Sequence, residues 1–252
     1  MKRFVLVPIA ACAALLACAP VSPERKMEAS ARMEMGITYM EQRNLPSAMR
    51  ELTKASELDP GNPEVDVALG LAYQTRGDLE KAGKYFREAI GKKSDYAEAH
   101  NNLGIVLSRQ GKGEEAIREF QAAASNVLYP TPEWAYYNMG EEYRRRRDRE
   151  KAEAMYRRAI GMNDRYVNAY LRLAMLQADR GRTEDAVRTL EVCVALSPDA
   201  VPAWMDLGKL FLSFGRRQDA ENAFRNVLAN SSDPVLRKQV SDFLNAAGKE
   251  NR

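Results

Sequence analysis

Histidine and cysteine are scarce in this chain of 252 residues, which contains one histidine and three cysteines. These counts exclude histidine-rich metal sites and thiolate clusters, and a Ser-His-Asp or Cys-His arrangement would have to be built on His100 alone. We expect His100 to be a half-buried packing residue rather than a base. The composition therefore predicts no catalytic site, no metal, no cofactor and no small-molecule substrate.

A large excess of charge of one sign is also missing. Lys and Arg number 38 against 35 Asp and Glu, so the formal net charge of +3 creates no strong overall field to attract nucleic acid. The run Arg144–Arg147 is the local exception and could indicate a nucleic-acid or anionic-lipid site. Acidic residues on both sides offset much of this charge, so we favour a solvated helix C-terminus.

A hydrophobic run long enough to span a bilayer is absent, because the longest one, Phe4 to Leu16, is too short. It follows Lys2 and Arg3 and ends in Leu15-Leu16-Ala17-Cys18. This segment resembles a bacterial lipoprotein signal, which predicts a signal peptide at residues 1–17 and lipidation of Cys18. The resemblance also implies outer-membrane localisation, since Ala19 rather than aspartate follows the cysteine. An ordinary cleaved secretory signal is the alternative.

Lipidation leaves no pair of cysteines for an intramolecular disulfide. Cys12 would leave with the signal peptide, and a lipid-attachment box ending at Cys12 would have too short an apolar core. Cys193 then remains alone and is expected to be a small buried residue. Residues 18–28, which include Pro20 and Pro23, are predicted to form a lipidated tether.

The rest of the chain follows a repeat of 34 residues. A glycine recurs at Gly36, Gly70, Gly104, Gly140 and Gly208, with Ala174 in the fifth repeat. Twelve residues later comes a small residue, and four beyond it a bulky one: Leu52, Phe86, Phe120, Tyr156, Leu190 and Phe224. Seven residues after the first glycine, a second one marks a turn in four repeats, while Arg43 and Arg147 occupy that place in the other two. Such spacing predicts two antiparallel helices per repeat.

This pattern resembles the tetratricopeptide repeat, so we expect an all-α, right-handed α-solenoid. The small residues would let the paired helices approach closely, and the bulky one would fill the space between that pair and the next. Six repeats are predicted at 29–62, 63–96, 97–130, 133–166, 167–200 and 201–234. The remaining residues, 235–252, would form a capping helix over about 235–247 and a short tail.

The first helix of each repeat would line a concave surface. In repeats one to three the predicted lining is apolar and suits an amphipathic helix or extended peptide of a partner protein. This predicted apolar groove consists of Met33, Ile37, Met40, Val67, Leu71 and Ile105. Lateral packing against neighbouring repeats is the alternative for each of these side chains.

In repeats four to six the same places are more polar, and they include Glu141. A secondary groove is predicted to contain Asn101, Tyr137, Asn138 and Arg144. Asn102, Asn138 and Arg172 share one place in successive repeats and partly resemble the carboxylate clamp of some tetratricopeptide co-chaperones. Ile105 stands where that clamp has asparagine, which argues against it.

Asn101-Asn102-Leu103-Gly104, Leu128-Tyr129-Pro130-Thr131 and Tyr137-Asn138-Met139-Gly140 resemble the type IV pilus biogenesis lipoproteins of the PilF, PilW and Tgl type. The resemblance covers essentially the whole chain. It implies a pilotin: a monomeric, lipid-anchored scaffold at the periplasmic face of the outer membrane that binds the secretin subunit and promotes its assembly into multimers. Many members carry a cysteine at the places of Ser108 and Glu142, and this chain lacks that bridge. The alternative is a tetratricopeptide lipoprotein serving another envelope machine, such as outer-membrane protein insertion or cell-wall synthesis.

Overall fold

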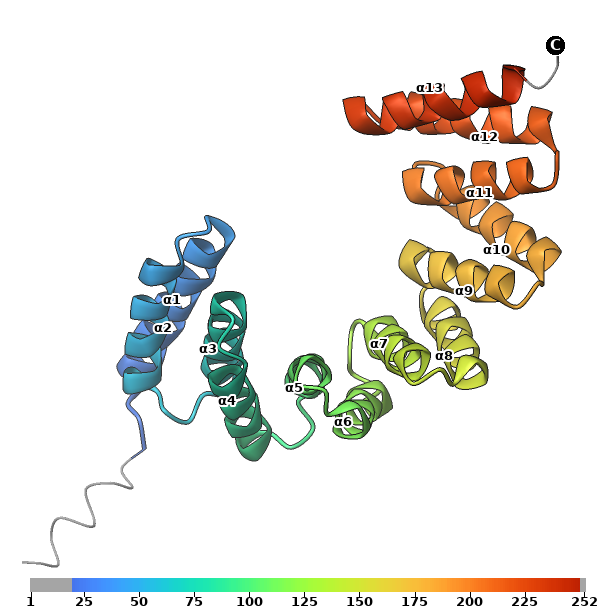
Figure 1. Ribbon diagram of the computed structural model, residues 1–252. Coiled ribbons are helices and arrows are strands. Elements are labelled where there is room, and N and C mark those ends of the chain that lie inside the picture. The colour runs from blue at the N-terminus through green and yellow to red at the C-terminus, as the bar shows by residue number, and fades with distance from the viewer. Residues whose placement is uncertain (1–19, 250–252) are drawn as a thin grey trace, which may run out of the picture. The chain divides into compact units, whose positions relative to one another are not determined.

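The computed structural model describes residues 20–249, and over that range it contains thirteen α-helices and no β-strand (Figure 1). The helices are α1 (Pro23–Glu41), α2 (Leu45–Leu58), α3 (Pro63–Arg76), α4 (Leu79–Lys92), α5 (Ala97–Arg109), α6 (Gly113–Ser125), α7 (Pro132–Arg145), α8 (Arg149–Met162), α9 (Val167–Asp179), α10 (Thr183–Leu196), α11 (Val201–Ser213), α12 (Arg217–Asn230) and α13 (Pro234–Lys249). The predicted all-α repeat fold is confirmed.

The chain divides into two compact units, and the boundary along the chain falls within α5, between Asn102 and Leu103. In the first unit, α1 packs on α2 and α3 packs on α4. In the second, α7 packs on α8, α9 on α10, and α11 on α12. Each of these pairs is joined by a tight turn (Figure 1), so every unit is built from helix hairpins of the kind that the 34-residue spacing predicts.

Close contact within each hairpin depends on the recurrent glycine. A methyl group on Gly70 or Gly208 would lie 2.5 Å from the ring of Phe86 or Phe224, which shows how tightly the ring covers the glycine. The bulky residue was expected to fill the space toward the next repeat. It fills the space inside its own repeat as well, because it lies one helical turn beyond the small residue that faces the first helix.

The turn inside each hairpin requires a left-handed backbone. Gly77, Gly111, Gly181 and Gly215 have φ values between 69° and 86°. Glycine adopts this conformation without steric cost, which explains its recurrence there. Arg43 and Arg147 occupy the same place with φ values of 59° and 62° and bear the cost of a side chain in that region.

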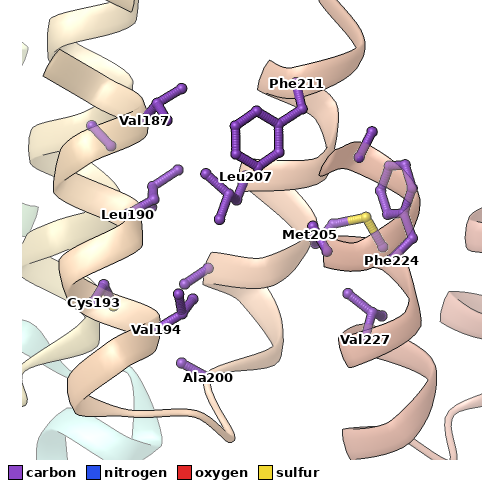
Figure 2. Close-up of a cluster of buried hydrophobic side chains, with 14 of the residues drawn as sticks. Val187, Leu190, Cys193, Val194, Ala200, Met205, Leu207, Phe211, Phe224 and Val227 are labelled. Atoms are coloured by element: carbon purple, nitrogen blue, oxygen red, sulfur yellow. The ribbon is translucent and has the colours of Figure 1, made fainter. Parts of the chain in front are cut away.

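The second unit has a continuous apolar core around α10, α11 and α12, part of which is drawn in Figure 2. Helix α13 extends this core, since Val240 is fully buried and the ring of Phe243 stacks on that of Phe224 at a centroid distance of 5.4 Å. Leu236 and Leu244 pack against the same cluster. The predicted capping helix is therefore present.

The N-terminal boundary differs from the prediction. Residues 23–28, assigned to the tether, are the first turns of α1. Ser22 caps this helix by accepting a hydrogen bond from the Arg25 amide, and Pro23 occupies a first-turn position where its lack of an N–H has no cost. The signal peptide and Cys18 lie outside the described residues. Between residues 20 and 249, no helix is both long and apolar enough to cross a membrane.

Candidate partner-binding surfaces

The predicted apolar groove has its first five residues on α1 and α3 of the first unit. Met33 and Met40 are half-buried and pack against the core cluster around Leu52 and Leu69. The two methionines therefore have a packing role. This corresponds to the alternative considered for each groove residue, in which the side chain packs laterally against a neighbouring repeat.

The other groove residues differ widely in exposure. Val67 is 4% exposed, whereas Ile37 is 39% exposed. Leu71 is half-buried, and Ile105 is half-buried within the second unit. Of the predicted groove residues in the first unit, Ile37 and part of Leu71 are thus the ones not taken up by core packing, a smaller surface than the sequence predicts.

A polar cluster joins α7, α8 and α9 in the second unit. Its centre is the Glu141 carboxylate, whose side chain is 14% exposed. Arg144 donates a hydrogen bond of 2.9 Å to it, and the Tyr156 hydroxyl donates one of 2.6 Å. Arg172, from the following repeat, lies 3.2 Å from the same carboxylate. One glutamate therefore holds two arginines at the junction of repeats four and five.

Electrostatics keep Glu141 ionised. Burial raises its pKa, but hydrogen bonds from Arg144 and Tyr156 and the charge of Arg172 lower it by more, so the net pKa lies below the usual value of 4.5. Burial and the neighbouring carboxylate raise the pKa of Tyr156, which therefore stays protonated as a donor. Both guanidinium groups remain partly exposed and can still contact an anionic group or main-chain carbonyls of a partner.

Three residues of the predicted secondary groove belong to the second unit. Tyr137 packs edge-on against Tyr166 at 5.5 Å and accepts a hydrogen bond of 3.4 Å from Arg172, so it borders the polar cluster together with Arg144. Asn138 is half-buried on the same helix. Asn101 belongs to the first unit and is buried.

The repeat pattern does not reveal the polar role of Tyr156. It predicts only the bulky side chain of repeat four at this position, where other repeats carry leucine or phenylalanine. The hydroxyl that distinguishes it from those residues was the available signal, since a buried tyrosine hydroxyl usually has a hydrogen-bond partner.

Ser108 and Glu142, at the positions where the resemblance implies a cysteine pair in other members, are in contact in this protein. Ser108 donates a hydrogen bond of 2.8 Å to the buried carboxylate of Glu142, and Arg145 pairs with that carboxylate at 2.8 Å. A polar contact therefore joins α5 and α7 where the resemblance implies a disulfide in other members.

Glutamates engage most of the arginine run. Arg144 pairs with Glu141, Arg145 with Glu142 and Arg146 with Glu114, each at 2.8–2.9 Å. Arg147 occupies the left-handed turn. This pairing favours the interpretation of a locally offset helix terminus.

The remaining candidates for reactive chemistry are held in packing environments. The His100 ring nitrogen lies 3.0 Å from the Ser94 carbonyl oxygen, and the ring is half-buried. Burial raises the pKa of the Cys193 thiol to about 11, so it is not a thiolate at neutral pH. Across residues 20–249, no three His, Cys, Asp or Glu side chains are grouped so that they could hold a metal ion.

Comparison with known families explains the repeating hairpins. One family model described as a tetratricopeptide repeat matches residues 95–165, and a second with the same description matches residues 33–97 and 137–201. The chain belongs to the tetratricopeptide repeat family. This repeat is a scaffold typical of proteins that bind other proteins rather than of enzymes, which agrees with the two surfaces described above.

Among characterised tetratricopeptide repeat proteins, this chain is similar to the type IV pilus assembly protein PilF of Pseudomonas aeruginosa. The two are 27% identical over 146 residues, which is 58% of each chain. An uncharacterised protein of Haemophilus influenzae is 33% identical over 40% of this chain and 56% of its own length. The matched regions thus span less than two thirds of these relatives.

Solved structures show the same fold. Pseudomonas aeruginosa PilF superposes with a TM-score of 0.71 and 20% identity, covering 87% of this chain and 99% of its own. PilW, described as a widely conserved type IV pilus biogenesis factor, superposes with a TM-score of 0.68 and 23% identity, covering 84% and 97%.

Proposed function

We propose that this protein is a pilotin for the type IV pilus, a lipid-anchored scaffold at the periplasmic face of the outer membrane. It binds the secretin subunit, and it promotes outer-membrane localisation of the secretin and its assembly into multimers. Its action is positional rather than chemical, because binding beside the membrane raises the local concentration of the subunits that must assemble there.

The similarity to PilF is the observation that carries this proposal. It holds in sequence over 146 residues and in structure over 87% of this chain, and the superposition takes in nearly all of the solved PilF chain. Many tetratricopeptide proteins share single hairpins, but agreement over a whole succession of repeats is more specific.

A deletion strain tests the proposal directly. Loss of the gene should abolish detergent-resistant secretin multimers on a gel, and the wild-type gene supplied in trans should restore them. Normal multimers in the deletion strain would contradict the proposal and favour the alternative, an adaptor for outer-membrane protein insertion or cell-wall synthesis.

Ile37 and Leu71, the predicted groove residues that remain accessible in the first unit, are the proposed secretin contact. Ile37→Glu with Leu71→Glu should weaken secretin capture in a pull-down by about tenfold or more, because buried apolar anchors dominate such interfaces. Since Leu71 is half-buried, Ile37→Glu alone should show the same direction with less risk to the fold.

Met27→Glu is the matched control, since Met27 is an exposed apolar residue of the same helix outside the predicted groove. Circular dichroism should remain helical in all three variants. Equal capture by wild type and both Ile37 variants would show that the secretin binds elsewhere.

A further inference from the structure

A second groove runs along α10 in repeats five and six. Two neighbouring hollows of about 350 and 300 Å³ border α10, and Glu191 lines both of them. We call the two together the α10 groove, and its apolar lining includes the buried residues Val187, Val194, Leu207 and Phe211, the half-buried Trp204 and the exposed Phe214. Figure 2 shows Val187 on α10 directed toward Phe211 and Leu207 on α11.

An ion pair between successive repeats lies at the corresponding place of the two preceding repeat junctions. Arg146 pairs with Glu114 at 2.9 Å between repeats three and four. Arg180 pairs with Glu150 at 2.9 Å between repeats four and five. In both, an arginine at the end of the first helix of a repeat reaches a glutamate at the start of the second helix of the preceding repeat.

At the junction of repeats five and six the equivalent glutamate is present, but the equivalent arginine is absent. Glu184 stands 34 residues after Glu150, and Phe214 stands 34 residues after Arg180. The substitution leaves a phenylalanine ring 42% exposed beside an exposed carboxylate. Because the arginine is absent, this junction has both an apolar opening and an unbalanced negative charge.

The cations around the α10 groove are already engaged. Arg188 pairs with Asp185 on α10, and Arg216 pairs with Asp219 at 2.7 Å while lying over the Phe211 ring. Glu184 and Glu191 have no ion-pair partner among the residues that the structure describes. They are two helical turns apart, so both acids lie on one edge of the groove.

The hollow between repeats three and four provides a contrast within the same unit. Its charged lining is Glu114, Arg118, Arg146, Asp148 and Lys151, which leaves one net positive charge. The charged lining of the α10 groove is Glu184, Arg188, Glu191, Arg216 and Asp219, which leaves one net negative charge. A basic partner is therefore favoured at the α10 groove over that hollow.

We propose that the α10 groove docks an amphipathic helix of a partner protein that carries lysine or arginine beside its apolar face. Its apolar side chains pack against Trp204 and Phe214, and cations two turns apart meet Glu184 and Glu191. This surface is distinct from the first-unit residues proposed to contact the secretin, and it does not depend on that proposal.

A synthetic helical peptide of leucine and lysine, with leucines at i, i+3, i+4 and i+7, is the probe. A matched leucine–glutamate peptide has the same apolar face and the opposite charge. Fluorescence anisotropy with the whole protein should show the lysine peptide binding about tenfold more tightly than the glutamate peptide.

Two variants locate the binding. Phe214→Arg introduces the residue that the preceding junctions carry, so the fold should persist, and the affinity for the lysine peptide should fall about tenfold. Glu184→Gln with Glu191→Gln should lower it about fivefold and reduce its dependence on salt.

Glu114→Gln with Glu115→Gln removes the same charge from α6 and should leave the affinity unchanged. The proposal is overturned if Phe214→Arg binds the lysine peptide as wild type does, or if the α6 control weakens binding equally. Self-association that Phe214→Arg abolishes, without binding of either peptide, would instead assign the groove to a second copy of this chain.

Discussion

Arg147 adopts a backbone conformation that an L-residue with a side chain rarely tolerates. Its φ of 62° places it in the left-handed region, where four other repeats use glycine. Arg147→Gly should therefore raise the free energy of unfolding, by about 1 kcal/mol, because the steric cost of the left-handed region exceeds the entropy that glycine adds to the unfolded chain. Urea denaturation followed by circular dichroism measures the change.

Gly181→Ala is the reciprocal variant, since it puts a side chain at the same place in repeat five, and it should lower the free energy of unfolding by about 1 kcal/mol. If Arg147→Gly is destabilising, the arginine makes a favourable contact that outweighs its backbone strain.

Gly208, the first recurrent glycine of its repeat, is required for a different reason, because an aromatic ring packs directly against it. A Cβ on Gly208 would lie 2.5 Å from Phe224, a ring that is fully buried and stacked on Phe243. Because neither ring can move freely, Gly208→Ala should destabilise the second unit by about 1–3 kcal/mol.

Gly161→Ala is the matched control, because it changes helix propensity without introducing a contact with a ring. Gly161 is also helical, but a Cβ there meets nothing within 4 Å, so alanine should stabilise by up to about 1 kcal/mol. Thermal and urea unfolding of both variants should thus shift in opposite directions. A stabilising Gly208→Ala would mean that the close approach does not constrain the hairpin.

Among the elements, α7, α8 and α9 are connected through Glu141. Its folded-state pKa lies below the ordinary value of 4.5, so its contribution to stability is fully present above that value and is lost as the pH falls through the lower folded pKa. Glu141→Gln should cost about 1 kcal/mol at pH 7, since it leaves two arginines close together, and the difference from wild type should shrink in acid.

Glu184→Gln is the control for that pH series, because Glu184 is exposed and makes no ion pair within residues 20–249. Its loss of unfolding free energy at pH 7 should be smaller than that of Glu141→Gln, because it breaks no ion pair. A Glu141→Gln deficit that is equally large at pH 3 and pH 7 would show that packing, and not charge, holds the three helices.

The helices and their turns could be predicted from sequence because each depends on a few local residues. Gly77 and its equivalents mark the left-handed turn, and Gly70 with Phe86 marks the close hairpin. The accessible surface could not be predicted in the same way. Val67 and Met33 occupy positions that suit a groove, yet Val67 is buried and Met33 packs against the core. How much of each side chain stays exposed depends on side chains that are distant in sequence.

The polar cluster illustrates the same limit. Arg172 and Glu141 belong to different repeats, and their contact depends on how α9 and α7 each pack on α8. The α10 groove was also not predicted, because Phe214 resembles an ordinary core residue until its place is compared with the ion-paired Arg180.

For the molecule as a whole, the proposed partner surfaces lie in separate units. Ile37 precedes the boundary at residue 102, and the α10 groove lies beyond it. In repeat proteins each hairpin contacts mainly its neighbours, so substitutions in one unit should leave binding at the other unchanged.

The proposed location at the membrane depends on Cys18. In the proposed function the lipid on Cys18 is the anchor, each buried methylene contributing about 0.8 kcal/mol. Cys18→Ala should therefore shift the protein out of the outer-membrane fraction, while circular dichroism stays helical.

The other two cysteines supply matched controls for that fractionation. Cys12→Ala should leave the protein in the outer-membrane fraction, because Cys12 is expected to leave with the signal peptide. Cys193→Ala should do so as well, because Cys193 is buried in the repeat core and alanine fits the same place in other repeats. Cys18→Ala that still fractionates with the outer membrane would rule out the lipid as the anchor, and loss of the Cys12 variant from the membrane would move the attachment site to Cys12.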